Sequence, residues 1–481
     1  MSGTAEVHTK AHCFFLDGKW VSEGEPLEVR SPFDRELVGT TIRPRASHIE
    51  AAIQATVRAY ETTRKLPAYE RQRILRSVAQ GITDQREDFA RIIALEAGKP
   101  IRTARAEVER AIFTFGIAAE ESTRIGGEWL PLDLQAFAER RWAIVRRFPL
   151  GPVAAITPFN FPLNLVAHKW APAIAAGCSI VHKPASQTPL SALLLAELVE
   201  QAGWPRGALN VLPLAGHDAE LLVADERLRM LSFTGSAVVG WDLKQKAGKK
   251  RVTLELGGNA GVIVHHDADL EYAAERCVSG GFSYAGQSCI SVQRIFVHAK
   301  VLENFQAAFL PRVQKLKVGN PLDESTDVGP MISEADAQRA EQWINEAHNA
   351  GAKILCGGKR NGSLLEPTVL TGTRPEQRLN CQEVFAPLVT VEAYDDFGDA
   401  VRRVNDSPYG LQAGIFTRDA KLLFHAYELL EVGGVIAGDV PTFRIDHMPY
   451  GGVKDSGLGR EGLRYAIEEM TEPKLLVVSM Q

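Results

Sequence analysis

Short apolar runs alternate with helix-like segments between Gly151 and about Val264, and this alternation constrains the fold more than any other feature of the sequence. The expected strands are 153–157, 179–182, 209–212 and 230–233, and the expected helices are 163–176, 190–201 and one that begins near Ser236. Parallel strands need crossover connections, so the alternation indicates a parallel sheet covered by helices on both faces. Such a sheet is typical of nucleotide-binding proteins, by analogy alone.

A second alternating block runs from about Gly257 to Tyr450 and would carry Cys289. Its expected strands are 295–297, 353–355 and 389–392, and its expected helices are 301–315, 334–350 and 421–430. Strand-like pieces between residues 129 and 148, and again at 474–479, belong to neither block. Exposed strand edges of this kind invite pairing with another chain.

A chain of 481 residues is too long for one ordinary core, so two or three domains are expected. The formal net charge is −5, from 54 basic and 59 acidic residues, and no basic tract stands out, which makes nucleic acid an unsuitable partner. The six cysteines show no Cys-x-x-Cys pair, so neither a disulfide framework nor a zinc site is expected, and no other metal is expected.

Residues 1–10 are polar and lack an apolar signal core, and no run approaches the roughly 20 apolar residues of a membrane span. With reduced cysteines, these features predict a cytoplasmic protein that is not bound to a membrane.

Three residues have sequence surroundings suited to catalysis. Cys289 lies among glycines and small polar residues, with Gly286 letting the backbone turn, so its thiol is expected to be reachable. Glu255 lies between two leucines, where desolvation would raise its proton affinity. Asn160 lies between two prolines, and its amide could donate to an oxyanion. Taken singly, the cysteine could be inert, and the glutamate and the asparagine could be ordinary turn residues.

In this order and spacing the three residues resemble the aldehyde dehydrogenase superfamily, and the resemblance extends from about Phe14 to the run at 474–479. Further motifs that carry it are His-Lys-Pro-Ala at 182–185, Phe-Thr-Gly-Ser at 233–236, Glu-Val-Phe-Ala-Pro at 383–387 and Pro-Tyr-Gly-Gly at 449–452. The chain looks most similar to the branch of non-phosphorylating glyceraldehyde-3-phosphate, lactaldehyde and phosphonoacetaldehyde dehydrogenases.

The resemblance implies an α/β fold with a Rossmann-type parallel-sheet cofactor domain, an α/β catalytic domain and a small β oligomerisation arm. It places the cofactor domain at 1–128 and 149–256 and the catalytic domain at 257–455. The arm and the C-terminal tail would be 129–148 and 456–481, and a homodimer or homotetramer is implied.

The same resemblance implies NAD(P)-dependent oxidation of an aldehyde to a carboxylic acid. Cys289 would add to the aldehyde as a thiolate, and Asn160 with the Cys289 backbone N–H would form the oxyanion hole. Glu255 would then activate the water that hydrolyses the thioester. Two other functions stay open: transfer of the acyl group to coenzyme A, against which Glu255 speaks, and a non-catalytic family member, against which the intact catalytic residues speak.

Cofactor contacts are implied for residues in motifs that match the family. The Gly-x-Gly-x-x-Gly fingerprint is absent, and the helix start after residue 233 would hold the diphosphate instead. Without the resemblance, a solvated Lys183 and a simple helix cap at Ser236 would be the ordinary interpretations. A proline that often follows the Leu-Gly-Gly element is replaced here by Ala260 and Gly261. The implied cofactor residues are Thr157, Lys183, Ser186, Gly235, Ser236, Leu256, Glu383 and Phe385.

Ser186 predicts use of NADP, with NAD also possible. In many NAD-using members a glutamate at this position binds both ribose hydroxyls and would repel a 2′-phosphate. A neutral hydroxyl beside Lys183 leaves room for that phosphate. Alternatively, Ser186 caps the following helix.

Substrate contacts are also inferred from the resemblance. Phe161 and His168 are expected on the helix after Asn160, Arg110 on an earlier helix that faces the tunnel, and Arg444 near its mouth. Ser288 takes the place of an arginine found in phosphate-handling members, so a short hydroxy- or carboxy-aldehyde is expected. The alternative is that both arginines make structural salt bridges. The expected substrate residues are Arg110, Phe161, His168, Ser288 and Arg444.

Overall fold

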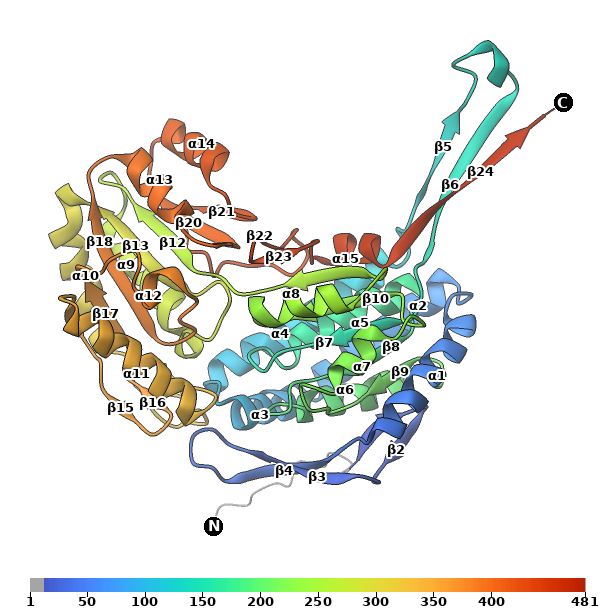
Figure 1. Cartoon of the computed structure of the whole chain (residues 1–481), viewed down its shortest axis with the longest axis horizontal. Coiled ribbons are helices and arrows are strands. Elements are labelled where there is room, and N and C mark those ends of the chain that lie inside the picture. The colour runs from blue at the N-terminus through green and yellow to red at the C-terminus, as the bar shows by residue number, and fades with distance from the viewer. Residues whose placement is uncertain (1–12, 481) are drawn as a thin grey trace.

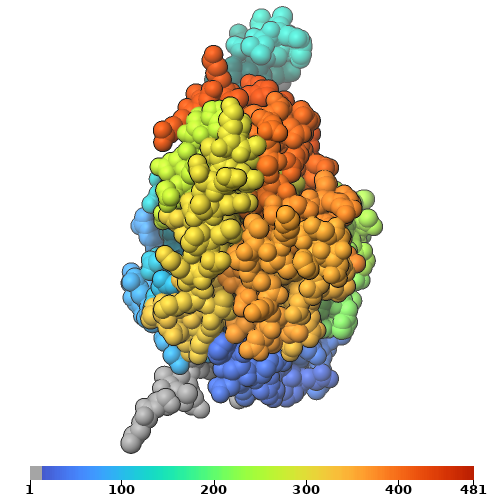
Figure 2. Space-filling view, turned by 90° about the vertical axis from the view of Figure 1, so that its left-hand side faces the viewer, coloured from blue at the N-terminus to red at the C-terminus, as the bar shows by residue number. Residues whose placement is uncertain are grey.

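The computed structural model describes residues 13–480, so the expectation about residues 1–10 lies outside the described part of the chain. Two α/β blocks lie side by side, and a narrow three-stranded arm projects from the first block (Figure 1). In the side view the second block covers most of the visible face, with the N-terminal strands below it and the arm above it (Figure 2). The expected α/β class is confirmed.

The first block is built on a sheet of eight strands, in which β9, β8, β7, β10 and β11 run parallel. In spatial order the strands are β2 (Lys19–Val21), β1 (Phe14–Leu16), β9 (Leu209–Val211), β8 (Ile180–Lys183), β7 (Val153–Ile156), β10 (Met230–Thr234), β11 (Arg251–Glu255) and β23 (Gly457–Leu458). The four strands expected from the sequence in residues 153–233 are all present, with ends shifted by one residue.

Both faces of this sheet are apolar, because alternate side chains of a strand point to opposite faces. In β7, Val153 and Ala155 belong to one buried cluster, and Ala154 and Ile156 to the other. The first face packs on α2 (Ala68–Asp84), α3 (Arg86–Ala97), α4 (Ile101–Glu121), α5 (Asn164–Ala176) and α6 (Leu190–Gln201). The second packs on α1 (Ala46–Thr63), α7 (Ala219–Ala224) and α8 (Ala237–Lys246).

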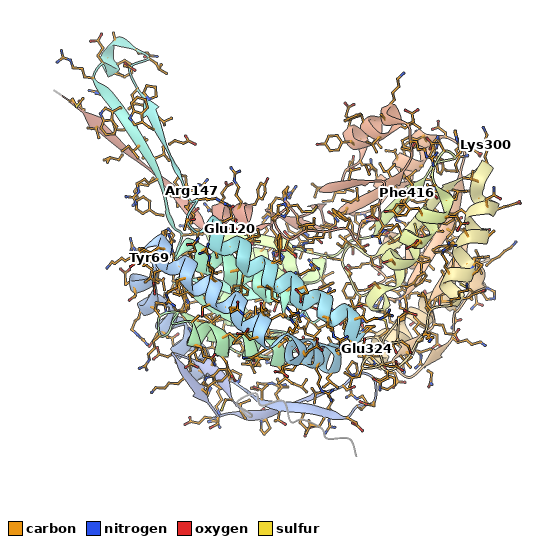
Figure 3. The ribbon with its side chains drawn as sticks, turned by 180° about the vertical axis from the view of Figure 1, so that it is seen from behind. Tyr69, Glu120, Arg147, Lys300, Glu324 and Phe416 are labelled. Atoms are coloured by element: carbon orange, nitrogen blue, oxygen red, sulfur yellow. The ribbon has the colours of Figure 1, made fainter. Side chains whose placement is uncertain are left out.

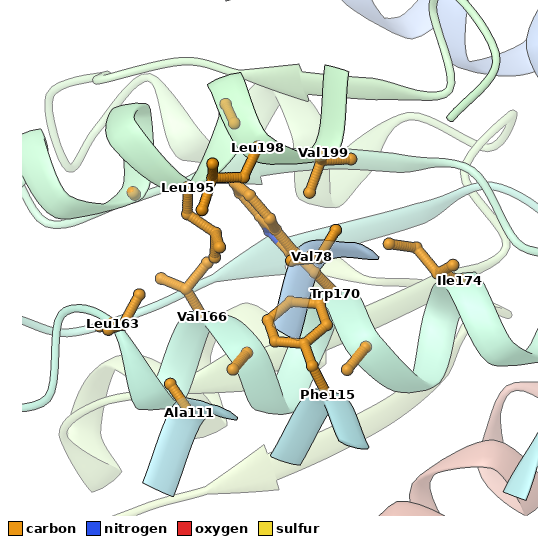
Figure 4. Close-up of a cluster of buried hydrophobic side chains, with 14 of the residues drawn as sticks. Val78, Ala111, Phe115, Leu163, Val166, Trp170, Ile174, Leu195, Leu198 and Val199 are labelled. Carbon is orange, nitrogen blue, oxygen red and sulfur yellow. The ribbon is translucent and has the colours of Figure 1, made fainter. Parts of the chain in front are cut away.

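Trp170 of α5 lies at the centre of the first cluster and has no exposed surface. Figure 4 shows it among side chains of α2, α4 and α6, including Val78, Phe115 and Leu198. The apolar face of α5 is therefore fixed against three helices as well as the sheet. This matters for the site, because the loop that leads into α5 carries Asn160.

The second block is built on a seven-stranded sheet, in which only the pairing of β14 with β17 is antiparallel. In spatial order the strands are β14 (Lys353–Cys356), β17 (Thr368–Thr371), β18 (Leu388–Tyr394), β13 (Val292–His298), β12 (Ala260–Val264), β20 (Gln412–Phe416) and β21 (Gly434–Ala437). Its helices are α9 (Leu270–Phe282), α10 (Leu302–Gln314), α11 (Glu334–Asn349), α12 (Arg378–Cys381), α13 (Phe397–Asn405) and α14 (Ala420–Leu429).

The arm is an antiparallel sheet in the order β24 (Thr471–Ser479), β6 (Arg141–Pro149) and β5 (Gly127–Pro131). Arg147 marks its base in the rear view, close to Glu120 at the end of α4 (Figure 3). Among the described residues 456–480, only β24 belongs to this sheet. The strand β23 pairs with β11, and α15 (Leu463–Glu469) packs on the first block. A separate hairpin is formed by β3 (Glu25–Arg30) and β4 (Leu37–Arg43).

None of the helices within residues 13–480 is long and apolar enough to cross a membrane.

Candidate active site

The site lies where the carboxyl ends of the parallel strands in the first block meet the second block. Asn160 follows β7, Gly235 follows β10, and Glu255 is the last residue of β11. Cys289 comes from the second block, in the loop between α9 and β13. All four line one cavity of about 260 Å³. Loops at this edge of a parallel sheet are the usual place for a ligand.

Cys289 is presented by a turn in the left-handed backbone region. Tyr284, Ala285 and Gly286 have φ of 50°, 51° and 67°, a conformation that is costly for residues with a side chain. The Tyr284 hydroxyl donates to the carbonyl of Ala97, 2.9 Å away, and so ties the turn to the first block. The surrounding contacts therefore hold a strained turn directly before the thiol.

The Cys289 thiol is partly exposed, and its sulfur lies 2.9 Å from the Tyr450 hydroxyl. Burial raises the pKa of the thiol to about 11, although the hydrogen bond with Tyr450 and the charge of Arg444 act in the opposite direction. The backbone of Cys289 packs closely against Gly258, because a Cβ at Gly258 would lie 2.2 Å from the Cys289 carbonyl oxygen. Only glycine fits at that position.

Glu255 is a buried carboxyl group, and neither of its oxygens has a hydrogen-bond partner among the described residues. Burial, together with repulsion from Glu461, raises its pKa well above the ordinary value, and the cations Lys169 and Arg444 only partly offset this. A buried carboxyl without partners is costly for stability and is typical of a functional site. The raised pKa agrees with the desolvation that the sequence predicted from the leucine neighbours of Glu255.

The side chain of Asn160 is 4% exposed and joins the two blocks. Its amide nitrogen donates to the carbonyl of Gln287, 3.1 Å away, and its second N–H remains for a ligand. Gln287 is itself fixed, because its side chain accepts from the N–H of Ile332 and donates to the carbonyl of Pro330. The amide is therefore held in place on the side of the second block that carries Cys289.

Both predicted substrate arginines line the cavity, and both are ion-paired. Arg110 of α4 makes two hydrogen bonds to Asp446, of 2.6 and 3.0 Å. Arg444 donates to Glu461 at 2.8 Å, and its guanidinium carbon lies 3.6 Å from the centre of the Tyr450 ring. The structural salt bridges left open by the sequence are thus present. Arg110 retains 29% exposure of its side chain, so it can also face a ligand.

The other predicted substrate residues lie in different positions. Phe161 forms part of the cavity wall, in the turn before α5 rather than on the helix where the sequence placed it. Ser288 also lines the cavity. His168 is on α5 but is buried behind the wall, with its Nε2 2.8 Å from Asp446. Asp446 therefore connects His168 to Arg110, and His168 is not among the lining residues.

A second cavity shares residues 158–159 and 234–236 with the first, and it extends over the carboxyl ends of β8 and β10. Its walls include five of the residues predicted to contact the cofactor, namely Thr157, Lys183, Ser186, Gly235 and Ser236. Ser236 is the N-cap of α8 and its side chain makes no capping bond, so the backbone N–H groups of the first turn can bind an anion.

Two details of the second cavity fit a dinucleotide. Lys183 is 9% exposed, its ammonium has no ion pair or hydrogen bond among the described residues, and burial lowers its pKa to about 8. Gly235 lies against a ring, because a Cβ there would come within 2.5 Å of Phe233. Ser186 does not cap α6; its hydroxyl donates to the carbonyl of Leu214, 3.0 Å away.

The remaining predicted cofactor residues, Leu256, Glu383 and Phe385, line the first cavity. Glu383 accepts a 3.0 Å hydrogen bond from the N–H of Gly258, and burial raises its pKa to about 7. A Cβ at Gly257 would lie 2.4 Å from the Glu383 carboxylate. Phe385 has φ of 53° and packs edge-on against Phe159, with ring centres 5.9 Å apart. In the second cavity, the Thr157 hydroxyl oxygen lies 2.9 Å from Nε2 of His182.

Several site residues were not singled out from the sequence. Tyr450 was noted only as part of a motif, and its contact with the thiol becomes visible in the fold. Asp446 and Glu461 bind Asn164 and Lys169, which lie 282 and 292 residues earlier in the chain, and no local pattern marks these buried groups. Arg339 of α11 lines the cavity and donates to the carbonyl of residue 384. Nothing in the sequence around Arg339, within the polar first half of α11, marks it as a site residue.

Comparison with known proteins agrees with this geometry. The sequence profile of the aldehyde dehydrogenase family matches residues 20–476. The 3-sulfolactaldehyde dehydrogenase of Priestia aryabhattai is 45% identical, over 99% of this chain and 100% of that protein.

Two solved structures are also closely similar. Aldehyde dehydrogenase 21 of Physcomitrella patens, in complex with the reaction product succinate, has a TM-score of 0.96 and 46% identity, over 98% of both chains. Glyceraldehyde-3-phosphate dehydrogenase GapN of Methanocaldococcus jannaschii, complexed with NADP, has a TM-score of 0.92 and 41% identity, over 95% of this chain and 100% of that one. The resemblance carried by Cys289, Glu255 and Asn160 is thereby confirmed, and the chain belongs to the aldehyde dehydrogenase family.

Proposed function

We propose that this enzyme oxidises a short hydroxy- or carboxy-aldehyde to the acid with NADP or NAD, through a thioester on Cys289 that water hydrolyses. The observation that carries the proposal is the convergence of Cys289, Glu255 and Asn160 on one cavity that opens into the cleft of Lys183. Glu255 favours hydrolysis over transfer to coenzyme A, because a buried carboxyl with raised pKa is suited to activate water.

Each group has a defined part in this chemistry. The Tyr450 hydroxyl and the Arg444 charge stabilise the Cys289 thiolate, which adds to the aldehyde carbon. The free N–H of Asn160 and the Cys289 backbone N–H donate to the oxygen that gains charge. A bound nicotinamide cofactor supplies the hydride acceptor. Glu255 then takes a proton from water, whose oxygen attacks the thioester carbon and releases the acid and the Cys289 thiolate.

The cavity supports an anionic or hydroxylated substrate. Arg110 and Arg444 enter it, and Asp446 and Glu461 behind them fix their orientation. The ligands of two similar proteins are also short and anionic, since one protein is named for 3-sulfolactaldehyde and the other was solved with its product succinate. A long aliphatic aldehyde would leave the polar groups of both arginines without new partners, which disfavours its binding.

Assembly and location are part of the proposal. We infer a homodimer or homotetramer formed through the arm, because β24 and β5 leave its edges open and Leu475, Leu476 and Trp129 are exposed on it. The boundaries 1–128 with 149–256, 257–455, and 129–148 with 456–481 stay our domain assignment. A cytoplasmic location is supported by the scattered spacing of the six cysteines.

Cys289 and Glu255 are expected to separate kinetically. Cys289→Ala should abolish both steps, and Glu255→Gln should still give a burst of reduced cofactor while steady turnover falls about 100-fold or more, because general base catalysis of hydrolysis is lost. Stopped-flow absorbance of the reduced cofactor measures both phases. The exposed Glu271→Gln on α9 is the control. Unchanged steady turnover in Glu255→Gln would remove this carboxyl from the mechanism.

Arg110→Met should raise KM for succinic semialdehyde about 10-fold or more and leave KM for propanal nearly unchanged, because only the anion loses a charge-assisted hydrogen bond. Steady-state kinetics with the two aldehydes gives the ratio. Arg102→Met is the matched control, since Arg102 lies on the same helix and pairs with Asp327 outside the cavity. Equal effects on both aldehydes would show that Arg110 does not bind the substrate.

NADP should be used at least as well as NAD, as the ratio of kcat/KM for the two cofactors measures. The ratio should fall as pH rises from 7 to 9, because a Lys183 with a pKa of about 8 loses its charge over that range. Ser186→Glu should lower the ratio at least 10-fold by repelling the 2′-phosphate. Ser186→Ala should change it little, since this hydroxyl already donates to Leu214. A tenfold preference of the unaltered enzyme for NAD contradicts the expectation.

Leu476→Asp should shift the assembly toward smaller species, because a charge would be buried at the arm interface. Light scattering at micromolar concentration measures the mass. Leu37→Asp is the control, since Leu37 is similarly exposed but lies on β4, away from the arm. A monomeric unaltered enzyme would contradict assembly through the arm.

A further inference from the structure

Lys99 is a fully buried lysine that the chemistry described above does not use. It lies in the short connection between α3 and α4, directly after Gly98, whose φ is 66°. A Cβ at Gly98 would lie 2.6 Å from Pro330, so the connection is packed against the segment to which Gln287 also binds. A buried ammonium is costly unless it is paired, and its partners show what it holds together.

The first partner of Lys99 leads to the loop of Asn160. The ammonium forms an ion pair with Glu107 of α4, and both side chains are fully buried. The other carboxylate oxygen of Glu107 accepts hydrogen bonds of 2.9 and 3.1 Å from the N–H groups of Leu163 and Asn164. These N–H groups lie at the start of α5, three and four residues after Asn160. Lys99 and Glu107 therefore fix the C-terminal end of the Asn160 loop.

The second set of partners joins that loop to the turn of Cys289. The Lys99 nitrogen lies 3.7 Å from the centre of the Phe161 ring and 4.4 Å from that of the Tyr284 ring. The two rings also contact each other edge-on, with centres 6.3 Å apart. Phe161 is adjacent to Asn160, and Tyr284 begins the strained turn that presents Cys289. One ammonium thus lies against an aromatic side chain from each of the two loops.

The ammonium is charged at neutral pH. Burial lowers the pKa of Lys99 to about 8, and Arg110 adds to the lowering, while the Glu107 carboxylate opposes it. A charged ammonium attracts the faces of both rings, and the attraction is strong where water is excluded. A neutral side chain of the same length would fill the space without that attraction.

We propose that Lys99 is a positioning residue for the oxyanion hole. It holds the Asn160 loop and the Cys289 turn in one relative placement, so that the Asn160 amide and the Cys289 N–H point at the same oxygen. The two loops come from different blocks, and a small relative displacement would separate the two donors. The inference rests on the proposed roles of Asn160 and Cys289, and it adds a third residue that acts through them.

The test combines Lys99→Met with Asn160→Ala in a double-mutant cycle, read as the single-turnover rate of cofactor reduction. Lys99→Met alone should slow this rate about 10- to 100-fold, because misplaced groups lose most of their effect on the transition state. In the Asn160→Ala background the same change should slow it less than threefold, since Lys99 acts through Asn160. Binding of NADP, followed by fluorescence quenching, should stay within twofold.

A second variant guards against a folding defect. Lys99→Met with Glu107→Gln removes both buried charges and keeps an acceptor oxygen for the N–H groups at the start of α5. It should fold, with a thermal midpoint near that of the unaltered enzyme, and should still show the slow single-turnover rate. The control is Lys244→Met, which removes a lysine stacked on Trp241 outside both cavities.

The outcomes separate the two levels of the proposal. An unchanged rate in both Lys99 variants, or an equal loss with and without the Asn160 side chain, would overturn the role of Lys99. Full activity of Asn160→Ala alone would instead overturn the role of Asn160, whatever the Lys99 variants show.

Discussion

The carboxyl ends of β7, β10 and β11 face the second block, and this shared direction places Asn160, Gly235 and Glu255 at the site. A parallel sheet aligns the ends of its strands at one edge, so the loops that follow them meet without further design. The thiol must then come from the opposite side. It does so on a turn that the Tyr284 hydroxyl ties back to α3. The site is therefore a seam between two independently packed cores, and its geometry depends on the bonds that cross this seam.

Burial raises the pKa of two carboxyl groups at this seam, but their hydrogen-bond partners differ. Glu255 has no partner and a raised pKa, whereas Asp446 accepts from Arg110, Asn164 and His168 and its pKa lies far below the ordinary value. Within the same low-dielectric surroundings, the presence or absence of hydrogen-bond donors thus decides the direction of each pKa shift. Asp446 orients Arg110 toward the cavity, whereas both carboxyl oxygens of Glu255 have no hydrogen-bond partner among the described residues.

The sequence predicted the architecture well, because its signals were local. The helix at 190–201 was located to the residue, and the strands that lead to Asn160 and Gly235 were located within one residue. The resemblance supplied the family, and the structure brings its three candidate catalytic residues to one cavity. The position of Phe161 was wrong, because α5 begins only at Asn164, where Glu107 accepts from the first N–H groups.

Other features could not be read from the sequence, because they depend on long-range contacts. Lys99, 190 residues from Cys289 in the chain, meets Tyr284 and Phe161 only after both blocks have folded. The ion pairs of Arg110 and Arg444 have the same origin. An arginine in a sequence shows its charge but not its partner, and here the partners decide which side of each guanidinium a ligand can reach.

The C-terminal segment from Glu461 to β24 connects the site to the arm. Glu461, which holds Arg444 and Lys169, is followed within two residues by α15, and α15 leads directly into β24 of the arm. The segment between Glu461 and β24 is held to the first block by the packing of α15 and by Arg251 of β11, which donates to the carbonyls of Glu469 and Thr471. The base of the arm and the charged groups near Glu255 therefore belong to one short segment of the chain.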